Sequence, residues 1–138
     1  VCMVQIKARP TDAELAILQV LWNRGPSTVR HVFEALADER ETGYTTTLKL
    51  MQIMADKGLV TRDESARTHI YTAHASRDLT QRRLVTDLLN RAFGGSAAAL
   101  VMQALSTHPL SAEELRDIEQ LIADYKKELE ASTGRLQS

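Results

Sequence analysis

Apolar side chains recur at helical spacing in three successive segments of the first half of the chain, residues 11–24, 28–36 and 43–57. The first segment opens on Thr11 followed three residues later by Glu14, the spacing of a capping box at a helix N-terminus. Ser27 or Thr28 can cap the second segment, and a glycine directly follows the first and third. The pattern predicts three short helices.

The helical period is lost after Gly58, where β-branched and aromatic residues become frequent. They gather at Val60 and Thr61 and again over residues 68–72, on either side of the polar stretch "DESAR". Two such runs around a polar tip are typical of a β-hairpin. Three helices followed by a hairpin form the order of a winged helix-turn-helix domain, which we expect over residues 1–75, with residues 1–9 as a flexible tail.

The third predicted helix carries two rows of side chains on opposite sides. One row, Thr47, Leu50, Met51 and Met54, has the spacing of a buried face, and the other consists of Thr45, Leu48, Lys49 and Gln52. In a winged helix the third helix enters the DNA major groove, and hydroxyl, amide, ammonium and apolar groups match phosphate, base-edge and thymine-methyl contacts. The second row is therefore predicted to face DNA, although a solvated helix face would show the same pattern.

The rest of the chain, residues 76–138, has the pattern of three amphipathic helices. The first of them carries Leu88 and Phe93, and the short second one is expected to turn Leu100, Val101, Ala104 and Leu105 inward. In the last helix apolar residues alternate at spacings of three and four, at Leu115, Ile118, Ile122 and Tyr125. So small a group of helices cannot bury this much apolar surface alone, so the sequence predicts a helical region that joins two copies of the chain. The expected fold class is mainly α, a winged helix-turn-helix followed by a three-helix dimerisation region.

Composition and charge restrict the partners of such a protein. The 138 residues are 43% hydrophobic and 25% charged, and no run approaches the roughly 20 apolar residues of a membrane-spanning helix, so we expect a cytoplasmic protein. The net charge is −1, and residues 1–75 hold nine basic and nine acidic residues. Any binding to DNA must therefore depend on the local placement of cations. The equal numbers of basic and acidic residues are also compatible with a winged helix that binds another protein in place of DNA.

Motifs for catalysis or metal binding are not found in the sequence. The single cysteine, Cys2, is expected to be a terminal thiol, and the four histidines lack the clustered spacing of a metal site. "GGS" at residues 94–96 is not the G-x-S-x-G motif of a nucleophilic serine. We therefore predict no catalytic residue, no metal and no cofactor, and no small-molecule ligand is evident from the sequence.

Several segments in a fixed order resemble the BlaI/MecI/CopY family of bacterial repressors, the penicillinase repressor family. They are "TDAELAILQVLW", "GPSTVRHVFEAL", "GYTTTLKLMQIMADKGLV", "ARTHIYTA", "LVTDLLNRAFGGSAAALV" and "LSAEELRDIEQLI". The resemblance implies a homodimer that binds double-stranded DNA at an inverted-repeat operator. It also implies release through cleavage of the repressor, triggered by a membrane metalloprotease sensor.

The resemblance also assigns site residues. The groove-facing positions of the family fall on Thr45, Thr46, Leu48, Lys49 and Gln52, and the wing position falls on Arg67. Two positions depart from the family pattern: Ile53 stands where a basic residue is frequent, and Thr47 where an apolar core residue is frequent.

The position of the cleaved bond departs from the family as well. For the penicillinase and methicillin-resistance repressors, the resemblance implies cleavage between Asn and Phe in the helix after the double glycine, and the equivalent bond here joins Gln103 and Ala104. No Asn-Phe pair occurs in the chain, and a pocket filled by a Phe ring would lose most of its contacts with Ala. We expect either a protease of different specificity or release by another route, such as direct binding of a ligand.

Overall fold

A computed structural model of the chain describes the backbone of residues 9–137 and the side chains of residues 9–134. The expected tail therefore lies, except for Arg9, outside the described residues, as does Cys2. The chain divides into two compact units after Val85, within a helix, and each unit is described by itself.

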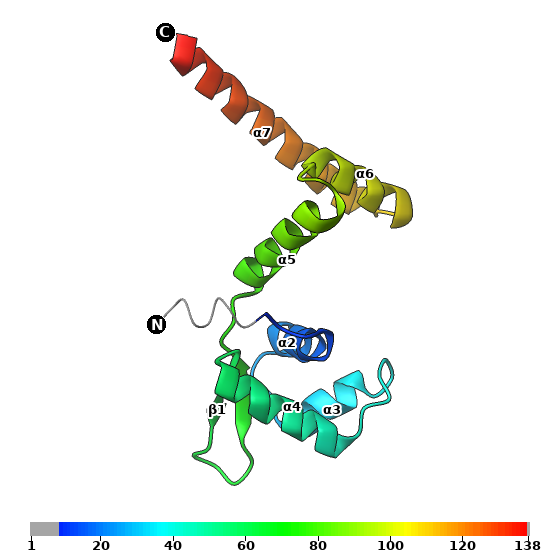
Figure 1. The fold of residues 1–138 in the computed structure, drawn as a ribbon, viewed down its shortest axis with the longest axis vertical. Coiled ribbons are helices and arrows are strands. Elements are labelled where there is room, and N and C mark those ends of the chain that lie inside the picture. Colours follow the sequence, from blue (N-terminus) through cyan, green and yellow to red (C-terminus); the bar gives the residue numbers. More distant parts are fainter. Residues whose placement is uncertain (1–8, 138) are drawn as a thin grey trace. The chain divides into compact units, whose positions relative to one another are not determined.

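Within the described residues, the first unit holds the start of a later helix and, before it, three helices and a hairpin in the order predicted for a winged helix (Figure 1). They are α2 (Asp12–Arg24), α3 (Val29–Leu36), α4 (Tyr44–Lys57), β1 (Val60–Asp63) and β2 (Ile70–Ala73). The three helices pack against one another, while β1 packs on α4 and β2 on α2. The mainly helical winged-helix fold expected from the sequence is confirmed.

Local signals fix the ends of these helices. At the start of α2, the Thr11 hydroxyl accepts the backbone N–H of Glu14 at 3.2 Å, and Glu14 Oε1 accepts the backbone N–H of Thr11 at 2.9 Å. Thr28, one of the two expected caps, begins α3 in the same way by accepting the N–H of His31 at 3.1 Å. Gly58 ends α4 at φ 83°, in the left-handed region that favours glycine.

Long-range backbone pairing attaches the hairpin to the helices. β1 and β2 are antiparallel, with Val60 opposite Ala73 and Asp63 opposite Ile70. Tyr71 in β2 also exchanges two backbone hydrogen bonds with Ser27 in the turn between α2 and α3, of 2.8 and 3.0 Å. This extra bridge gives the hairpin a fixed base.

One hydrophobic core joins all the elements of the winged helix. Its members are Ile17, Leu18, Leu21, Val29, Val32, Leu36, Met51, Met54, Leu59, Val60 and Tyr71. The buried row predicted for the third helix is present, since Thr47, Met51 and Met54 are buried and Leu50 packs against the core. Each element thus contributes to the burial that holds α4 in place.

The helices that follow show no comparable core. α5 (Arg77–Ala92) runs through the division, and α6 (Ala97–Thr107) and α7 (Ala112–Gln137) follow it. Gly94 and Gly95, both at positive φ, end α5, and a capping box between Ser111 and Glu114 opens α7. No described residue of α5 or α6 is buried.

The expectation that α6 turns an apolar face inward is wrong for the single chain. Leu100 is half-buried, whereas Val101, Ala104 and Leu105 are exposed. The helical period indicates that one face is apolar, but it does not identify what lies against that face, and the latter three side chains are exposed in the structure of the described residues.

Candidate nucleic-acid interface

Four of the residues predicted to contact DNA form an exposed row on α4. Thr45, Thr46, Lys49 and Gln52 are exposed, while the opposite row is buried in the core. Leu48, the fifth predicted residue of this helix, is half-buried and packs against the core. The row therefore offers two hydroxyls, an amide and an ammonium group, the donors and acceptors that reach phosphates and base edges in a major groove.

A threonine inside the core helps to set the start of α4. The side chain of Thr47 is 2% exposed, and its hydroxyl donates to the carbonyl oxygen of Gly43 at 3.1 Å. This bond satisfies the buried hydroxyl, so a polar residue is tolerated where an apolar one is frequent in the family pattern.

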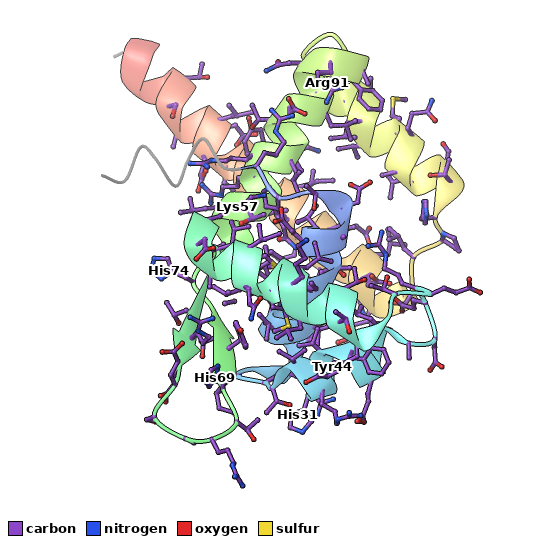
Figure 2. All side chains as sticks on the ribbon, turned by 60° about the horizontal axis from the view of Figure 1, so that its bottom comes forward. His31, Tyr44, Lys57, His69, His74 and Arg91 are labelled. Atoms are coloured by element: carbon purple, nitrogen blue, oxygen red, sulfur yellow. The ribbon has the colours of Figure 1, made fainter. Side chains whose placement is uncertain are left out.

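A partly buried ion pair holds the C-terminal end of α4. Lys57 Nζ lies 2.9 and 3.1 Å from the two carboxylate oxygens of Glu14, which is buried at the start of α2 (Figure 2 labels Lys57). Burial acts to raise the pKa of Glu14, but the backbone N–H of Thr11 and the ammonium group of Lys57 together keep the pKa below its ordinary value. The carboxylate is therefore charged at neutral pH and connects α2 to α4.

The wing carries cations and acids in equal number. Arg67, the predicted wing contact, is exposed in the turn between the strands. Arg62 pairs with Glu64 at 2.7 Å, and a hydrogen bond with Tyr71 is the main cause that raises the Arg62 pKa. Asp63 accepts the backbone N–H of Ser65, and hydrogen bonds with that residue lower the Asp63 pKa. Of these cations, Arg67 is the one that no acidic side chain of the described residues pairs with.

An arginine and two aromatic rings meet beside the first turn of α4, a cluster that the sequence patterns did not single out. The guanidinium carbon of Arg30 lies 5.2 Å from the centre of the Tyr44 ring. The Phe33 ring contacts Tyr44 edge to face, with 5.7 Å between ring centres and 80° between planes. In Figure 2, Tyr44, His31 of α3 and His69 of the wing lie toward the same side of the unit. Arg30 and Phe33 are three residues apart on α3, and Tyr44 follows them by fourteen and eleven residues. These spacings match no known motif, so only the folded structure shows the cluster.

Comparisons with known proteins agree with this architecture. The sequence profile of the penicillinase repressor family matches residues 10–124. The chain belongs to this family. A transcriptional regulator named BlaI from Mycobacterium tuberculosis is 40% identical over 93 residues, which cover 65% of this chain and 67% of the relative. The penicillinase repressor of Bacillus licheniformis is 22% identical over 116 residues, which cover 84% of this chain and 91% of the relative.

Among solved structures, the chain is similar to the monomeric form of Bacillus licheniformis BlaI in complex with the blaP half-operator. The TM-score is 0.46 at 20% sequence identity, with 51% of this chain and 87% of the other covered.

The predicted dimerisation residues of this member of the penicillinase repressor family are in three places. Leu88 lies on α5, Phe93 directly follows α5, and the other four residues lie on α7. Leu88, Leu115, Ile122 and Tyr125 are exposed. Phe93 and Ile118 are half-buried. The predicted seam on α7 is therefore largely uncovered within one chain.

The bond between Gln103 and Ala104, which the family resemblance predicted to be the cleavage position, lies in α6. Gln103 and Ala104 are both exposed, and the hydroxyl of Thr107 donates to the carbonyl oxygen of Gln103 at 2.8 Å. That oxygen belongs to the peptide bond in question. Both residues are in helical conformation, so a protease would reach the bond only after this helix opens locally.

The junction between the winged helix and α5 is held by Trp22. Its indole N–H donates to the carbonyl oxygen of Ala75 at 3.0 Å, and the guanidinium of Arg77 lies 5.7 Å from the centre of its ring. Arg77 also donates to the side-chain oxygen of Asn23. Trp22 is half-buried and packs against the core, and at the same time it fixes the first turn of α5.

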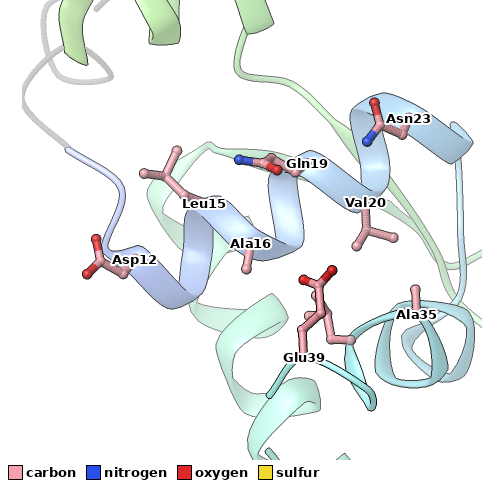
Figure 3. Close-up of a pocket in the computed structure, with 9 residues that line it drawn as sticks. Asp12, Leu15, Ala16, Gln19, Val20, Asn23, Ala35 and Glu39 are labelled. Atoms are coloured by element: carbon pink, nitrogen blue, oxygen red, sulfur yellow. The ribbon is translucent and has the colours of Figure 1, made fainter. Parts of the chain in front are cut away.

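An open groove of about 360 Å³ runs between α2 and the end of α3 (Figure 3). It is lined by Asp12, Leu15, Ala16, Gln19, Val20, Asn23, Ala35, Leu36 and Glu39. No residue of α4 or of the wing contributes, so the groove is separate from the candidate interface.

Among the described residues, no three His, Cys, Asp or Glu side chains converge as they would around a metal ion. Within residues 9–137, no helix is both long and apolar enough to span a bilayer.

Proposed function

We propose that this member of the penicillinase repressor family is a transcriptional repressor that binds operator DNA through the exposed row of α4. One observation carries the proposal: Thr45, Thr46, Lys49 and Gln52 share the solvent side of the helix that follows α2 and α3, and a hairpin follows it directly. In a winged helix this is the side that enters the major groove. Leu48 at the edge of the row is available for contact with a thymine methyl, and Arg67 for contact with a phosphate.

The same proposal includes a homodimer on an inverted repeat. The apolar side chains left exposed by α5, α6 and α7 need a cover, and a second copy provides one with a matching face. Leu88, Phe93 and the α7 seam would then form the interface. Two linked winged helices bind two half-sites about one helical turn apart, because linkage gives the second half-site a high effective concentration.

Binding to duplex DNA tests the proposal directly. Selection of bound duplexes from a random pool should enrich an inverted repeat, and affinity should fall as salt rises because phosphate contacts release counterions. Lys49→Ala should reduce the slope of log affinity against log salt by about 1, the loss of one phosphate contact. Lys126→Ala, on the exposed surface of α7, is the matched control and should leave the slope unchanged.

A second function, the binding of a protein partner by the winged helix, has its own support. Residues 1–75 contain as many acidic as basic residues, and one of the two wing arginines is paired with Glu64. Wild-type protein that shows no salt-dependent binding to any duplex would favour this alternative and overturn the proposed repressor.

Release from DNA is proposed to follow cleavage at Gln103-Ala104 by a membrane metalloprotease whose specificity differs from that of proteases acting on Asn-Phe bonds. Incubation of the purified repressor with a membrane fraction from induced cells, followed by mass mapping of fragments, tests this step. Fragments that end at Gln103 support it. An intact chain that nevertheless leaves the DNA would instead indicate release by another route, such as a bound ligand.

A further inference from the structure

Arg30 lies on α3, the helix that supports α4, and yet it is held beside the first turn of α4. Its guanidinium carbon is 5.2 Å from the centre of the Tyr44 ring, within the distance at which a cation is attracted by an aromatic face. Tyr44 is the first residue of α4 and comes directly before Thr45 and Thr46. The arginine is thus placed next to the row that the proposed function assigns to DNA.

The Tyr44 ring is itself fixed from the other helix. Phe33 meets it edge to face at 5.7 Å and an interplanar angle of 80°, the arrangement that aromatic pairs prefer. Since Phe33 is half-buried, the pair anchors the ring between α3 and α4. The ring therefore holds the guanidinium in a defined position. Because the side chain is already ordered, it loses less conformational entropy on binding than an arginine that moves freely in solvent.

Most of the hydrogen-bonding capacity of Arg30 remains available. Its side chain is 65% exposed. Its ion pair with Glu34, one helical turn away, is 4.0 Å long and joins two exposed groups. Such a pair is weak in water. A guanidinium near a ring keeps donors at its edge, and several N–H groups in one plane suit a phosphate group.

We propose that Arg30 is a further phosphate contact of the repressor, and that Tyr44 is the residue that positions it. The contact would be made from α3 to the DNA backbone beside the groove that α4 enters, as expected for the supporting helix of a helix-turn-helix. The inference rests on the proposed function, because it assigns an additional cation to the same surface. It also supplies local positive charge to residues 1–75, which contain as many acidic as basic residues.

The test is the salt dependence of duplex binding by the full-length chain. Arg30→Gln should lower affinity roughly tenfold at low salt and reduce the salt slope by about 1, without preference for sequence. Arg82→Gln is the matched control, because Arg82 is also an exposed arginine with an acidic partner four residues away, Asp78, but lies on α5. It should change neither quantity.

A double-mutant cycle with Tyr44→Leu tests the positioning role. Tyr44→Leu should weaken binding in the wild-type background but have little further effect once Arg30→Gln is present, while Tyr44→Phe, which keeps the ring, should retain wild-type affinity. The fluorescence of Trp22 reports whether each variant is folded, and Arg30→Gln, at an exposed site, tests the contact even if Tyr44→Leu unfolds.

The outcomes separate three claims. Wild-type protein that does not bind DNA overturns the proposed function itself. Wild-type binding with Arg30→Gln indistinguishable from Arg82→Gln overturns the phosphate contact alone. Full and additive losses for Arg30→Gln and Tyr44→Leu overturn the positioning role.

Discussion

The winged helix and the helices after it differ in what covers their apolar side chains. In the first unit, Leu18, Val32, Met51 and Met54 are completely buried by other elements of the same unit. On α7, by contrast, Leu121 and Tyr125 are more than half exposed, and Ile122 nearly half. The elements of the first region bury one another's apolar side chains, whereas the described side chains of α7 form an amphipathic surface that remains exposed.

The comparison has a functional meaning. A rigid core keeps the exposed row of α4 in a defined position, which is required of side chains that contact base edges. An uncovered apolar face can join two such units, and it can also be disrupted without unfolding them. We expect the two regions to respond differently to the same chemical change.

The largest expected difference is between two Leu→Ala substitutions. Leu18→Ala removes a fully buried side chain and should lower the free energy of unfolding of the winged helix by about 2–5 kcal/mol. Leu121→Ala, at a site that is 68% exposed, should change it by less than about 0.5 kcal/mol. Urea unfolding followed by the fluorescence of Trp22, the single tryptophan, measures the winged helix specifically. Equal effects of the two substitutions would show that the regions do not differ as described.

The second prediction concerns self-association. Ile122→Asp places a charge on the predicted seam of both copies and should weaken the dimer roughly 100-fold, while the unfolding midpoint reported by Trp22 in dilute protein stays the same. Ala123→Asp, at the next residue, which is exposed and off the seam, is the control and should have a much smaller effect. Sedimentation velocity over a range of concentrations measures both. Wild-type protein that remains a monomer at micromolar concentration would contradict the dimer.

A smaller effect is expected at the ion pair between Glu14 and Lys57. The pKa of Glu14 is lowered from its ordinary value of 4.5 in the folded protein. The charged carboxylate therefore stabilises the fold fully at pH values above 4.5, and this contribution is lost as the pH falls through the lower pKa of the folded state. Glu14→Gln should therefore cost about 1–2 kcal/mol at neutral pH, in the lower part of the range for hydrogen bonds to charged groups, because Lys57 is one third exposed.

Below pH 4.5 the difference between Glu14→Gln and the wild type should shrink. Urea unfolding from pH 7 to pH 3 checks this, with Glu39→Gln as the exposed control. A cost of Glu14→Gln that stays constant over that range would mean that the charge of Glu14 does not stabilise the winged helix.

The smallest prediction restores a cation on α4. Ile53 is 37% exposed and stands where the family pattern often has a basic residue, so Ile53→Lys should add a phosphate contact without disturbing the core. Affinity for duplex DNA should rise a few-fold at low salt, and the salt slope should steepen by about 1. An unchanged slope would place Ile53 outside the interface.

Local signals allowed most of the first region to be predicted. Thr11, Thr28 and Gly58 mark helix ends through bonds that involve only neighbouring residues, and the period of α4 separates Met51 from Lys49. Thr45, Lys49 and Gln52 of the exposed row followed from this period, whereas Thr46 was assigned by the family resemblance. Leu48 is only partly in that row because it packs on the core, and the pattern alone could not distinguish the two environments.

Contacts between distant residues were not accessible to the same reasoning. The bridge from Ser27 to Tyr71, the pair of Glu14 with Lys57 and the Arg30 cluster each join separate elements and have no local signature. The covering of α6 was also mispredicted, because a helical period shows that a face is apolar but does not identify what lies against it.

The most direct test of a dimer that binds DNA through α4 is a titration of the full-length chain onto two duplexes. Both would carry the half-site obtained by selection, one with the two copies at the selected spacing of about one helical turn and one with about half a turn inserted between them. We predict at least tenfold weaker binding to the second duplex, since the two winged helices could no longer engage both half-sites together. Equal affinity for the two duplexes would contradict the account.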